Sequence, residues 1–277
     1  MPLTLEPITP ALGAVVRGVD LSHPLDAAGF AAVEAALLAH QVLFFRDQDI
    51  TQAQQRDFAG LFGPLHIHPI YPHSDQVAEI MILDTDLNDL ADNALWHSDV
   101  SFSELPPLGS VLAARVLPEL GGDTLWTSAT AAYDALPEPL KVLLAELTAS
   151  HDLAKSFPVE RFGADPESRA QLERAKQKNP PVTHPVIRTH PATGAKAIYV
   201  NEGFTTHING LPQDASDSLL NLLFRHVIRP EFTMRWRWRA GDVAIWDNRI
   251  TQHYAVDDYR PYRRVMHRAT VIGDRPF

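Results

Sequence analysis

The 277-residue sequence contains no cysteine. This absence excludes disulfides, iron–sulfur clusters, thiolate zinc sites and cysteine nucleophiles. The sequence also has no run of 18 apolar residues, so we expect neither a membrane-spanning helix nor a membrane partner. Its first residues do not form a basic stretch followed by an apolar one, and without such a secretion signal we expect a cytoplasmic protein.

Basic residues are also scarce. The sequence has 24 lysines and arginines against 34 aspartates and glutamates, which gives a net charge of −10 at pH 7. Nucleic acids bind to basic surfaces, so this balance disfavours a nucleic-acid partner. A small anion would need a site built locally from arginines. The sequence has neither a GxGxxG turn nor a Walker A loop, so it shows no motif for a dinucleotide or a nucleoside triphosphate.

The residues that are present fit a folded globular protein, because 45% are hydrophobic and 21% are charged. Short apolar or alternating segments predict a mainly β protein, a sandwich or jelly roll with helical insertions. We expect strands at 42–45, 79–84, 97–103, 110–116, 184–190, 196–201, 232–239, 243–246 and 265–272. We expect helices at 25–40, 51–61, 129–149 with a break at its prolines, and 214–226. Residues 150–180 show no strong periodicity, and we expect a lid or an insertion there.

His97 and Asp99 stand two positions apart in the segment 96–102. Residues i and i+2 of a strand point to the same face, so the imidazole and the carboxylate would lie side by side. They would supply two of the three ligands of a 2-His-1-carboxylate site, which binds Fe(II) and leaves positions open. His253 is the best candidate for the third ligand. The alternative is a hydrogen-bonded pair that binds no metal.

Two arginines share one face of the last predicted strand. Arg264 and Arg268 are four residues apart, or about 13 Å along a strand. Their guanidinium groups would enter one cavity at different depths, where each suits a carboxylate or a sulfonate. The alternative is a pair of surface arginines that bind acidic neighbours.

These two features together predict oxygen chemistry. Activation of O2 needs electrons, and the sequence has no motif for a flavin, a haem or a nicotinamide. An organic co-substrate such as a 2-oxo acid would then supply the electrons. One arginine would hold the far carboxylate of that acid, and the second arginine would remain for an anionic substrate.

The sequence resembles the Fe(II)- and 2-oxoglutarate-dependent dioxygenases of the taurine dioxygenase type, from about residue 42 to the end. The resemblance is carried by five blocks, 66–73, 96–102, 121–128, 201–206 and 244–269. It implies one catalytic domain over residues 1–277, with a double-stranded β-helix (jelly roll) fold. It also implies Fe(II) as cofactor, 2-oxoglutarate and O2 as co-substrates, and a homo-oligomer, either a dimer or a tetramer.

The resemblance assigns roles to individual residues. The implied iron ligands are His97, Asp99 and His253. Thr124 and Arg264 match the groups that hold 2-oxoglutarate. Three groups of positions match substrate contacts. His68, Arg268 and the Val100 backbone match the sulfonate contacts. Tyr71, Asn93 and Ser156 match the contacts at the amino end, with Asp92 nearby, and Phe157 and Phe204 match the apolar wall.

The implied activity is hydroxylation of taurine at the carbon that bears the sulfonate, which releases sulfite and aminoacetaldehyde with succinate and CO2. Residues 93–96 are more apolar than expected, which leaves room for a different preference at the amino end. One alternative is the same chemistry on another anion, such as an alkylsulfonate, a sulfate ester or an aryloxyacetate. The other alternative is a non-catalytic metal-binding jelly roll, which would bind iron without turning over 2-oxoglutarate.

Overall fold

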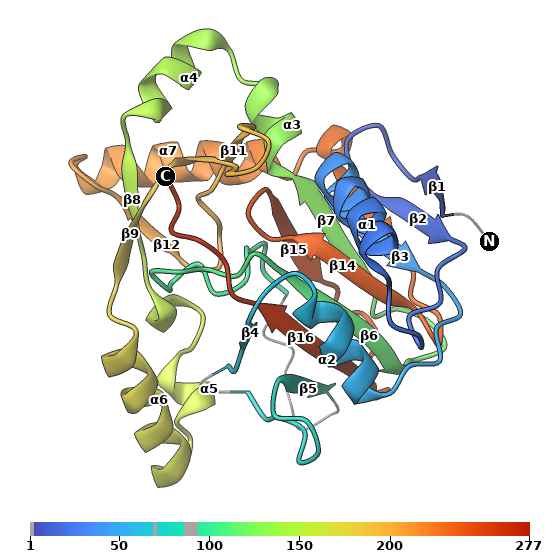
Figure 1. The fold of residues 1–277 in the computed structure, drawn as a ribbon. Helices are drawn as coiled ribbons and strands as arrows, with labels where there is room; N and C mark the ends of the chain where they lie inside the picture. The colour runs from blue at the N-terminus through green and yellow to red at the C-terminus, as the bar shows by residue number, and fades with distance from the viewer. Residues whose placement is uncertain (1–2, 69–70, 86–93) are drawn as a thin grey trace.

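A large mixed sheet forms the centre of the molecule (Figure 1). The computed structural model describes residues 3–68, 71–85 and 94–277. The sheet has eight strands in the order β1-β2-β3-β14-β6-β16-β4, and β5 pairs with β16. Their bounds are β1 Thr4–Pro7, β2 Ala14–Arg17, β3 Val42–Phe45, β4 Leu65–His66, β5 Ile80–Thr85, β6 Gly109–Val116, β14 Val243–Asp247 and β16 Arg264–Val271.

A smaller sheet packs against one face of the large one. It has the order β13-β7-β15, with bounds β13 Thr233–Trp236, β7 Thr124–Ser128 and β15 Thr251–Ala255. Aromatic side chains fill the space between the two sheets. Phe44 stacks on Trp236 with ring centroids 3.9 Å apart and meets Trp126 edge to face at 5.4 Å. The predicted mainly β sandwich is confirmed, and the tryptophans of 232–239 lie in its core.

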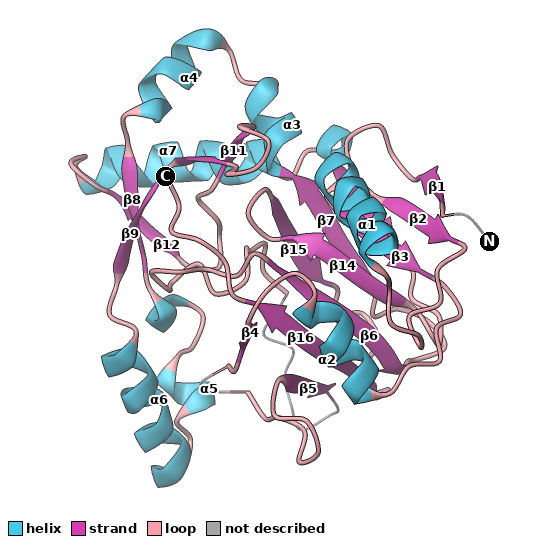
Figure 2. Cartoon of the chain, in the orientation of Figure 1, coloured by secondary structure: helices cyan, strands magenta, loops and turns pink. Residues whose placement is uncertain are grey.

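Two helices cover the other face of the large sheet, as Figures 1 and 2 show. They are α1 (Ala27–His40) and α2 (Gln52–Gly60). The four buried residues of β3 alternate between the layers: Phe45 packs with the helices and Phe44 with the smaller sheet. A capping box of Thr51 and Gln54 starts α2, as the sequence predicts.

A third group of elements lies beside this sandwich (Figure 2). It contains a three-stranded sheet in the order β12-β8-β9 and a two-stranded sheet of β10 and β11. The strands are β8 Thr148–His151, β9 Val182–Pro185, β10 Ile187–Thr189, β11 Lys196–Ile198 and β12 Thr205–Ile208. The helices are α3 Ala129–Asp134, α4 Glu138–Ala145, α5 Val159–Phe162, α6 Pro166–Lys178 and α7 Gln213–Val227, with 3-10 turns η1 Leu153–Lys155 and η2 Pro230–Phe232.

The predicted lid at 150–180 contains α5 and α6. Helix α6 begins at a capping box formed by Asp165 and Ser168, a short-range signal within a segment that lacks strong apolar periodicity. Leu172 of α6 packs in one apolar cluster with Phe157 and Phe204. This packing connects the segment to the candidate site, and its function as a lid stays a prediction.

The prediction of a strand over residues 97–103 is wrong. His97 forms only an isolated bridge with His253, and the chain turns from Asp99 onward. Val100 has φ of 51°, in the left-handed region that β-branched residues rarely adopt. The apolar residues around the His–Asp pair have the spacing of a strand, but they line a pocket instead. Within the described residues, no helix is both long and apolar enough to cross a membrane.

Candidate active site

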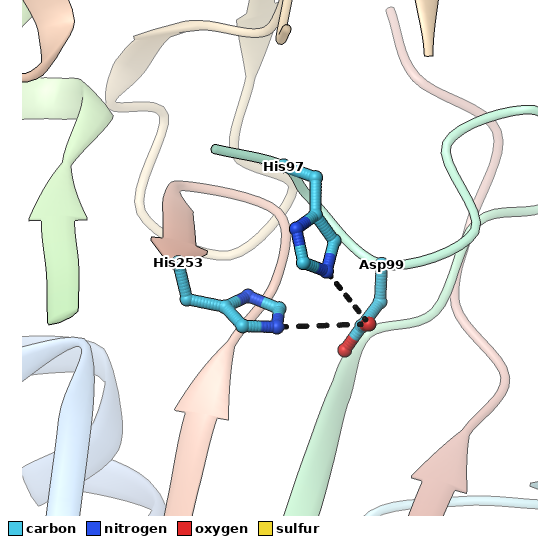
Figure 3. Close-up of side chains that lie close together, drawn as sticks. All are labelled: His97, Asp99 and His253. Carbon is cyan, nitrogen blue, oxygen red and sulfur yellow. Dashed lines mark ion pairs between the residues drawn. The ribbon is translucent and has the colours of Figure 1, made fainter. Parts of the chain in front are cut away.

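The side chains of His97, Asp99 and His253, from two distant segments of the sequence, point toward one another (Figure 3). One ligand atom from each of His97, Asp99 and His253 lies within 4.8 Å of the others, and all three residues are buried. The Asp99 Oδ1 atom is 3.7 Å from His97 Nε2 and 3.8 Å from His253 Nε2. This spacing leaves room for one metal ion among the three groups.

The backbone holds the two histidines at this distance. The His97 amide donates to the His253 carbonyl at 3.1 Å, and the His253 amide donates to the His97 carbonyl at 2.8 Å. Gly203 closes the other side, because a Cβ atom there would lie 2.8 Å from the His97 Cβ. Only glycine permits that approach without displacing His97.

The protonation states of the three groups suit a divalent metal. His97 Nδ1 is 2.7 Å from the Leu95 carbonyl, which places the proton on Nδ1 and leaves Nε2 to bind a metal. Burial, followed by the proximity of His97, lowers the pKa of His253 to about 3, so this ring is neutral. Burial alone would raise the pKa of Asp99, but Arg268 and His253 hold it well below its usual range. Two imidazoles and one carboxylate are the donor set that Fe(II) takes in oxygenases, so the residues present fit this metal.

A cavity of about 750 Å³ lies on one side of the triad, lined by His253, Thr124 and Arg264 among other residues. Arg264 is buried, and its Nε donates to the Gly122 carbonyl at 3.0 Å. Its Nη2 is 3.5 Å from Thr124 Oγ1, which also accepts from Trp238 Nε1 at 2.9 Å. Within residues 3–68, 71–85 and 94–277, Arg264 has no acidic partner in an ion pair. A buried cation of this kind fits the carboxylate of a bound anion such as 2-oxoglutarate.

The turn before β7 shapes this arginine site. Gly122 has φ of 69°, and a Cβ there would lie 3.0 Å from Arg264 Cδ. The Gly122 amide donates to Asp258 Oδ1 at 2.8 Å, which fixes the turn. Arg235 in turn binds Asp123 at 2.6 Å. The block at 121–128 therefore presents both Thr124 and the carbonyl that orients Arg264.

A second cavity of about 420 Å³ lies on the other side of the triad. Arg268 and Tyr71 line both cavities, so the two adjoin each other beside Arg268, which binds Asp99. Arg268 Nη1 donates to Asp99 Oδ1 at 2.7 Å. His68 Nδ1 accepts from the Tyr71 amide at 3.3 Å, which places the ring proton on Nε2. Burial, followed by the charge of Arg268, lowers the pKa of His68 well below its usual range.

The other predicted substrate contacts gather in this second cavity. Phe157 and Phe204 form one wall, and Val100 lies beside them. Ser156 also lines the cavity, and its hydroxyl donates to the Gly203 carbonyl at 2.5 Å. The prediction for Asn93, like that for Asp92, lies outside the described residues.

Sequence reasoning missed several residues that the structure brings to the site. Leu95 and Phe102 line the second cavity, and Trp246 and Tyr259 line the first. Asn248 binds the Asp99 backbone through its side-chain amide. Phe102, Trp246, Tyr259 and Asn248 lie within the blocks that carry the family resemblance, but sequence spacing alone does not say which members of a block reach the site.

A comparison with family models matches residues 4–270 to the Taurine catabolism dioxygenase TauD, TfdA family. The chain belongs to this family. It is 42% identical over 279 residues to an alpha-ketoglutarate-dependent sulfate ester dioxygenase of Pseudomonas putida, covering 99% of this chain and 91% of that protein.

Two solved structures also match. A taurine dioxygenase from Burkholderia xenovorans superposes with a TM-score of 0.85 at 35% identity, over 99% of this chain and 90% of the other. The protein AAD-2, in complex with Mn(II) and N-oxalylglycine, superposes with a TM-score of 0.81 at 32% identity, over 100% of this chain and 99% of the other. The predicted jelly-roll core is confirmed. The chain is a 2-oxoglutarate-dependent dioxygenase, and its reaction uses Fe(II), 2-oxoglutarate and O2.

Proposed function

We propose that this dioxygenase acts on alkyl sulfate esters and oxidises the carbon that carries the ester oxygen. His97, Asp99 and His253 hold Fe(II), and Arg264 with Thr124 binds the far carboxylate of 2-oxoglutarate. When bound, the ferrous iron activates O2 with electrons from 2-oxoglutarate. The sulfate end of the substrate lies against Arg268 and His68, and its alkyl chain extends along the phenylalanine wall.

The polarity of the second cavity carries this proposal. One end offers a guanidinium and an imidazole N–H, the two donors that a sulfate or a sulfonate needs. Apolar side chains form much of the remaining wall, among them Leu95, Phe102 and Phe157, while Tyr71 and Ser156 add polar groups. Asp99 is the one acidic side chain among the described residues that line this cavity, and it already binds Arg268. An anion with an apolar tail matches this cavity, with the anionic group at the cationic end and the tail along the apolar walls.

Taurine, predicted from the family resemblance, is less well supported. Its ammonium group would lose water on entering the cavity and would need acceptors in return. Tyr71 and Ser156 line the cavity and carry hydroxyls, but a hydroxyl is a weaker partner for a cation than a carboxylate. The relatives do not favour one of these substrates, since one is named for sulfate esters and another for taurine.

The residues of the site determine where the substrate is oxidised. Arg268 binds Asp99 and lines the second cavity, so a sulfate held by this arginine places the adjacent carbon next to the metal ligands. Holding that carbon in a near-attack position is worth several kcal/mol of the barrier. 2-Oxoglutarate loses CO2 and takes up one oxygen atom of O2 to become succinate, and the other oxygen atom forms a hydroxyl on this carbon. The C–O bond to sulfate then breaks, the hydroxyl proton passes to the leaving sulfate, and an aldehyde remains.

A substrate panel tests the proposal. Purified protein is given Fe(II), 2-oxoglutarate and O2 with hexyl sulfate, hexanesulfonate, taurine or an aryloxyacetate, and succinate is measured with sulfate, sulfite or phenol. We expect hexyl sulfate to give the highest kcat/KM, with one sulfate for each succinate. A higher kcat/KM for taurine, with sulfite release, would contradict the proposal and support the taurine prediction.

Arg268→Gln tests the proposed sulfate contact, and the Mn(II) affinity of the variant is measured beside it because Arg268 also binds Asp99. We expect the KM for hexyl sulfate to rise about 10- to 100-fold, because a charge-assisted contact is lost. Arg263→Gln is the matched control, since Arg263 is exposed and pairs with Asp84 on the surface. The cytoplasmic location and the homo-oligomeric state stay predictions.

A further inference from the structure

We propose that Asn248 is a positioning residue that fixes the backbone of Asp99 and thereby the direction of its carboxylate. The inference rests on the assignment of Asp99 as an iron ligand in the proposed function. Asn248 is not among the residues that line either cavity, and within the described part of the chain its side chain binds neither of the other two proposed ligands, so it acts through Asp99.

The segments that carry the proposed ligands run side by side for only a short distance. His97 and His253 exchange both backbone hydrogen bonds. One residue further, the Ser98 hydroxyl donates to the Thr251 carbonyl at 2.9 Å. At Asp99 no backbone partner from the β14–β15 connection is within reach, and the side chain of Asn248 takes its place. Only one residue pair is therefore joined by backbone hydrogen bonds, and side-chain hydrogen bonds join the two segments beyond it.

The Asn248 amide uses both of its ends on one residue. Its Oδ1 accepts from the Asp99 amide at 2.7 Å, and its Nδ2 donates to the Asp99 carbonyl at 3.0 Å. The second Nδ2 hydrogen reaches the Pro107 carbonyl at 3.2 Å. Asn248 is fully buried, and its own amide donates to the Leu108 carbonyl at 2.8 Å. A side-chain amide is the only group of this size that supplies both the acceptor and the two donors.

The neighbouring turn explains why Asp99 needs this support. Val100 has φ of 51°, in the left-handed region where a β-branched residue is strained. Without an external contact, the peptide between Asp99 and Val100 could relax and carry the carboxylate away from the histidines. Ser110 and Arg268 bind the carboxylate oxygens at 3.2 Å and 2.7 Å, and these contacts hold the side chain of Asp99 and not its backbone. Asn248 supplies that second, independent constraint.

The residues that flank Asn248 are themselves fixed. Asp247 accepts two hydrogen bonds from the Arg249 guanidinium at 2.8 Å and 2.6 Å, and one from His190 Nε2 at 2.9 Å. Burial would raise the pKa of Asp247, but these bonds from Arg249 and His190 lower it to about 2. The ionised Asp247 carboxylate, with its hydrogen bonds to Arg249 and His190, therefore fixes the backbone next to Asn248.

The test measures metal affinity without catalysis. Mn(II) is titrated into wild-type protein, Asn248→Ala and Asn248→Ser in the absence of 2-oxoglutarate and O2. The control is Gln55→Ala, which also removes a buried amide that bridges two backbone carbonyls, those of Val111 and His267, far from the triad in sequence. We expect both Asn248 variants to weaken Mn(II) binding about 10- to 100-fold, the range for loss of a residue that orients a metal ligand. We expect Gln55→Ala to bind Mn(II) as wild type does, with a comparable loss of Tm.

A second measurement follows the coupling of the reaction. With a misdirected carboxylate, we expect the Asn248 variants to form more succinate than sulfate, whereas Gln55→Ala keeps wild-type coupling. Two results would overturn the inference: Asn248 variants with wild-type Mn(II) affinity, or a loss of affinity in Gln55→Ala as large as theirs. If both Asn248 variants fail to fold while Gln55→Ala folds, Asn248 supports the whole fold and the positioning role is overturned. Wild-type protein that binds no Mn(II) overturns the proposed ligand set instead.

Discussion

Adjacent arginines at the start of β16 have opposite environments. Arg263 is exposed and binds Asp84 through Nε at 2.8 Å and through Nη2 at 2.5 Å. Arg264 is buried at the wall of the first cavity and has no acidic partner among the residues that the structure describes. The alternation of a strand produces this difference, since successive side chains point to opposite faces.

Replacement of Arg264 tests its proposed role in binding 2-oxoglutarate. We expect Arg264→Gln to raise the KM for 2-oxoglutarate about 10- to 100-fold, because charge-assisted hydrogen bonds to a carboxylate are lost. The KM is measured from succinate formation at saturating substrate. Arg263→Gln should leave it unchanged, and an equal rise in both variants would refute a specific site at Arg264.

At the scale of elements, the turn before β7 connects backbone conformation to this binding site. Gly122 and Gly194 have similar φ angles, 69° and 71°. A Cβ on Gly122 would lie 3.0 Å from Arg264 Cδ, whereas a Cβ on Gly194 would meet no atom within 4 Å. The two glycines therefore share the cost of a left-handed backbone but differ in what they touch.

Alanine at each glycine separates these effects. We expect Gly122→Ala and Gly194→Ala each to lose about 1 kcal/mol of the free energy of unfolding, the cost of a left-handed conformation for a residue with a Cβ. Gly122→Ala alone should raise the KM for 2-oxoglutarate, because its Cβ displaces Arg264. Chemical denaturation and succinate assays measure the two quantities. A raised KM in Gly194→Ala would show that stability, not local crowding, determines the affinity.

Elements with a strong local pattern could be predicted from the sequence. The β3 strand is a continuous apolar run, and α2 begins at a capping box, so their positions follow from short-range signals. The segment 97–103 could not be predicted, because tertiary contacts fold it into a turn although its alternation resembles a strand. The spacing of Arg264 and Arg268 predicts two anion-binding arginines, and the family resemblance supplies the proposed role of each. Asn248 could not be found in this way, since its partner Asp99 lies 149 residues away.

At the scale of the whole molecule, buried histidines make stability depend on pH. Burial lowers the pKa of His184 to about 4, from an ordinary 6.5, and lowers the pKa of His151 well below that value. Above pH 6.5 these rings are neutral in both the folded and the unfolded state. As the pH falls from 6.5 towards 4, the unfolded chain binds protons that the folded chain does not, so stability is lost across this window.

Denaturation at several pH values checks this expectation. The free energy of unfolding should be nearly constant from pH 8 to 7 and should fall below pH 6.5 by about 1.4 kcal/mol per pH unit for each such histidine. His184→Gln should give a shallower slope, because one proton-binding group is removed. The same slope in this variant, or equal stability at pH 7 and pH 5, would contradict the assignment of a neutral buried His184.

The layers of the sandwich bring the two cavities to a common point. β15 of the smaller sheet carries His253, β16 of the large sheet carries both arginines, and Asp99 lies where the cavities meet. In the proposed function, the anionic co-substrate and the anionic substrate each have their own arginine beside one metal.

Anaerobic absorption spectroscopy tests the proposed metal site most directly. Fe(II) and 2-oxoglutarate are added together to wild-type protein and to His253→Ala, with His207→Ala as a control outside the triad. We predict a visible absorption band that saturates at one Fe(II) per chain in wild type and in His207→Ala, and that shifts when hexyl sulfate is added. We predict no band in His253→Ala. A band of equal strength in His253→Ala, or none in wild type, would contradict the ligand set of His97, Asp99 and His253.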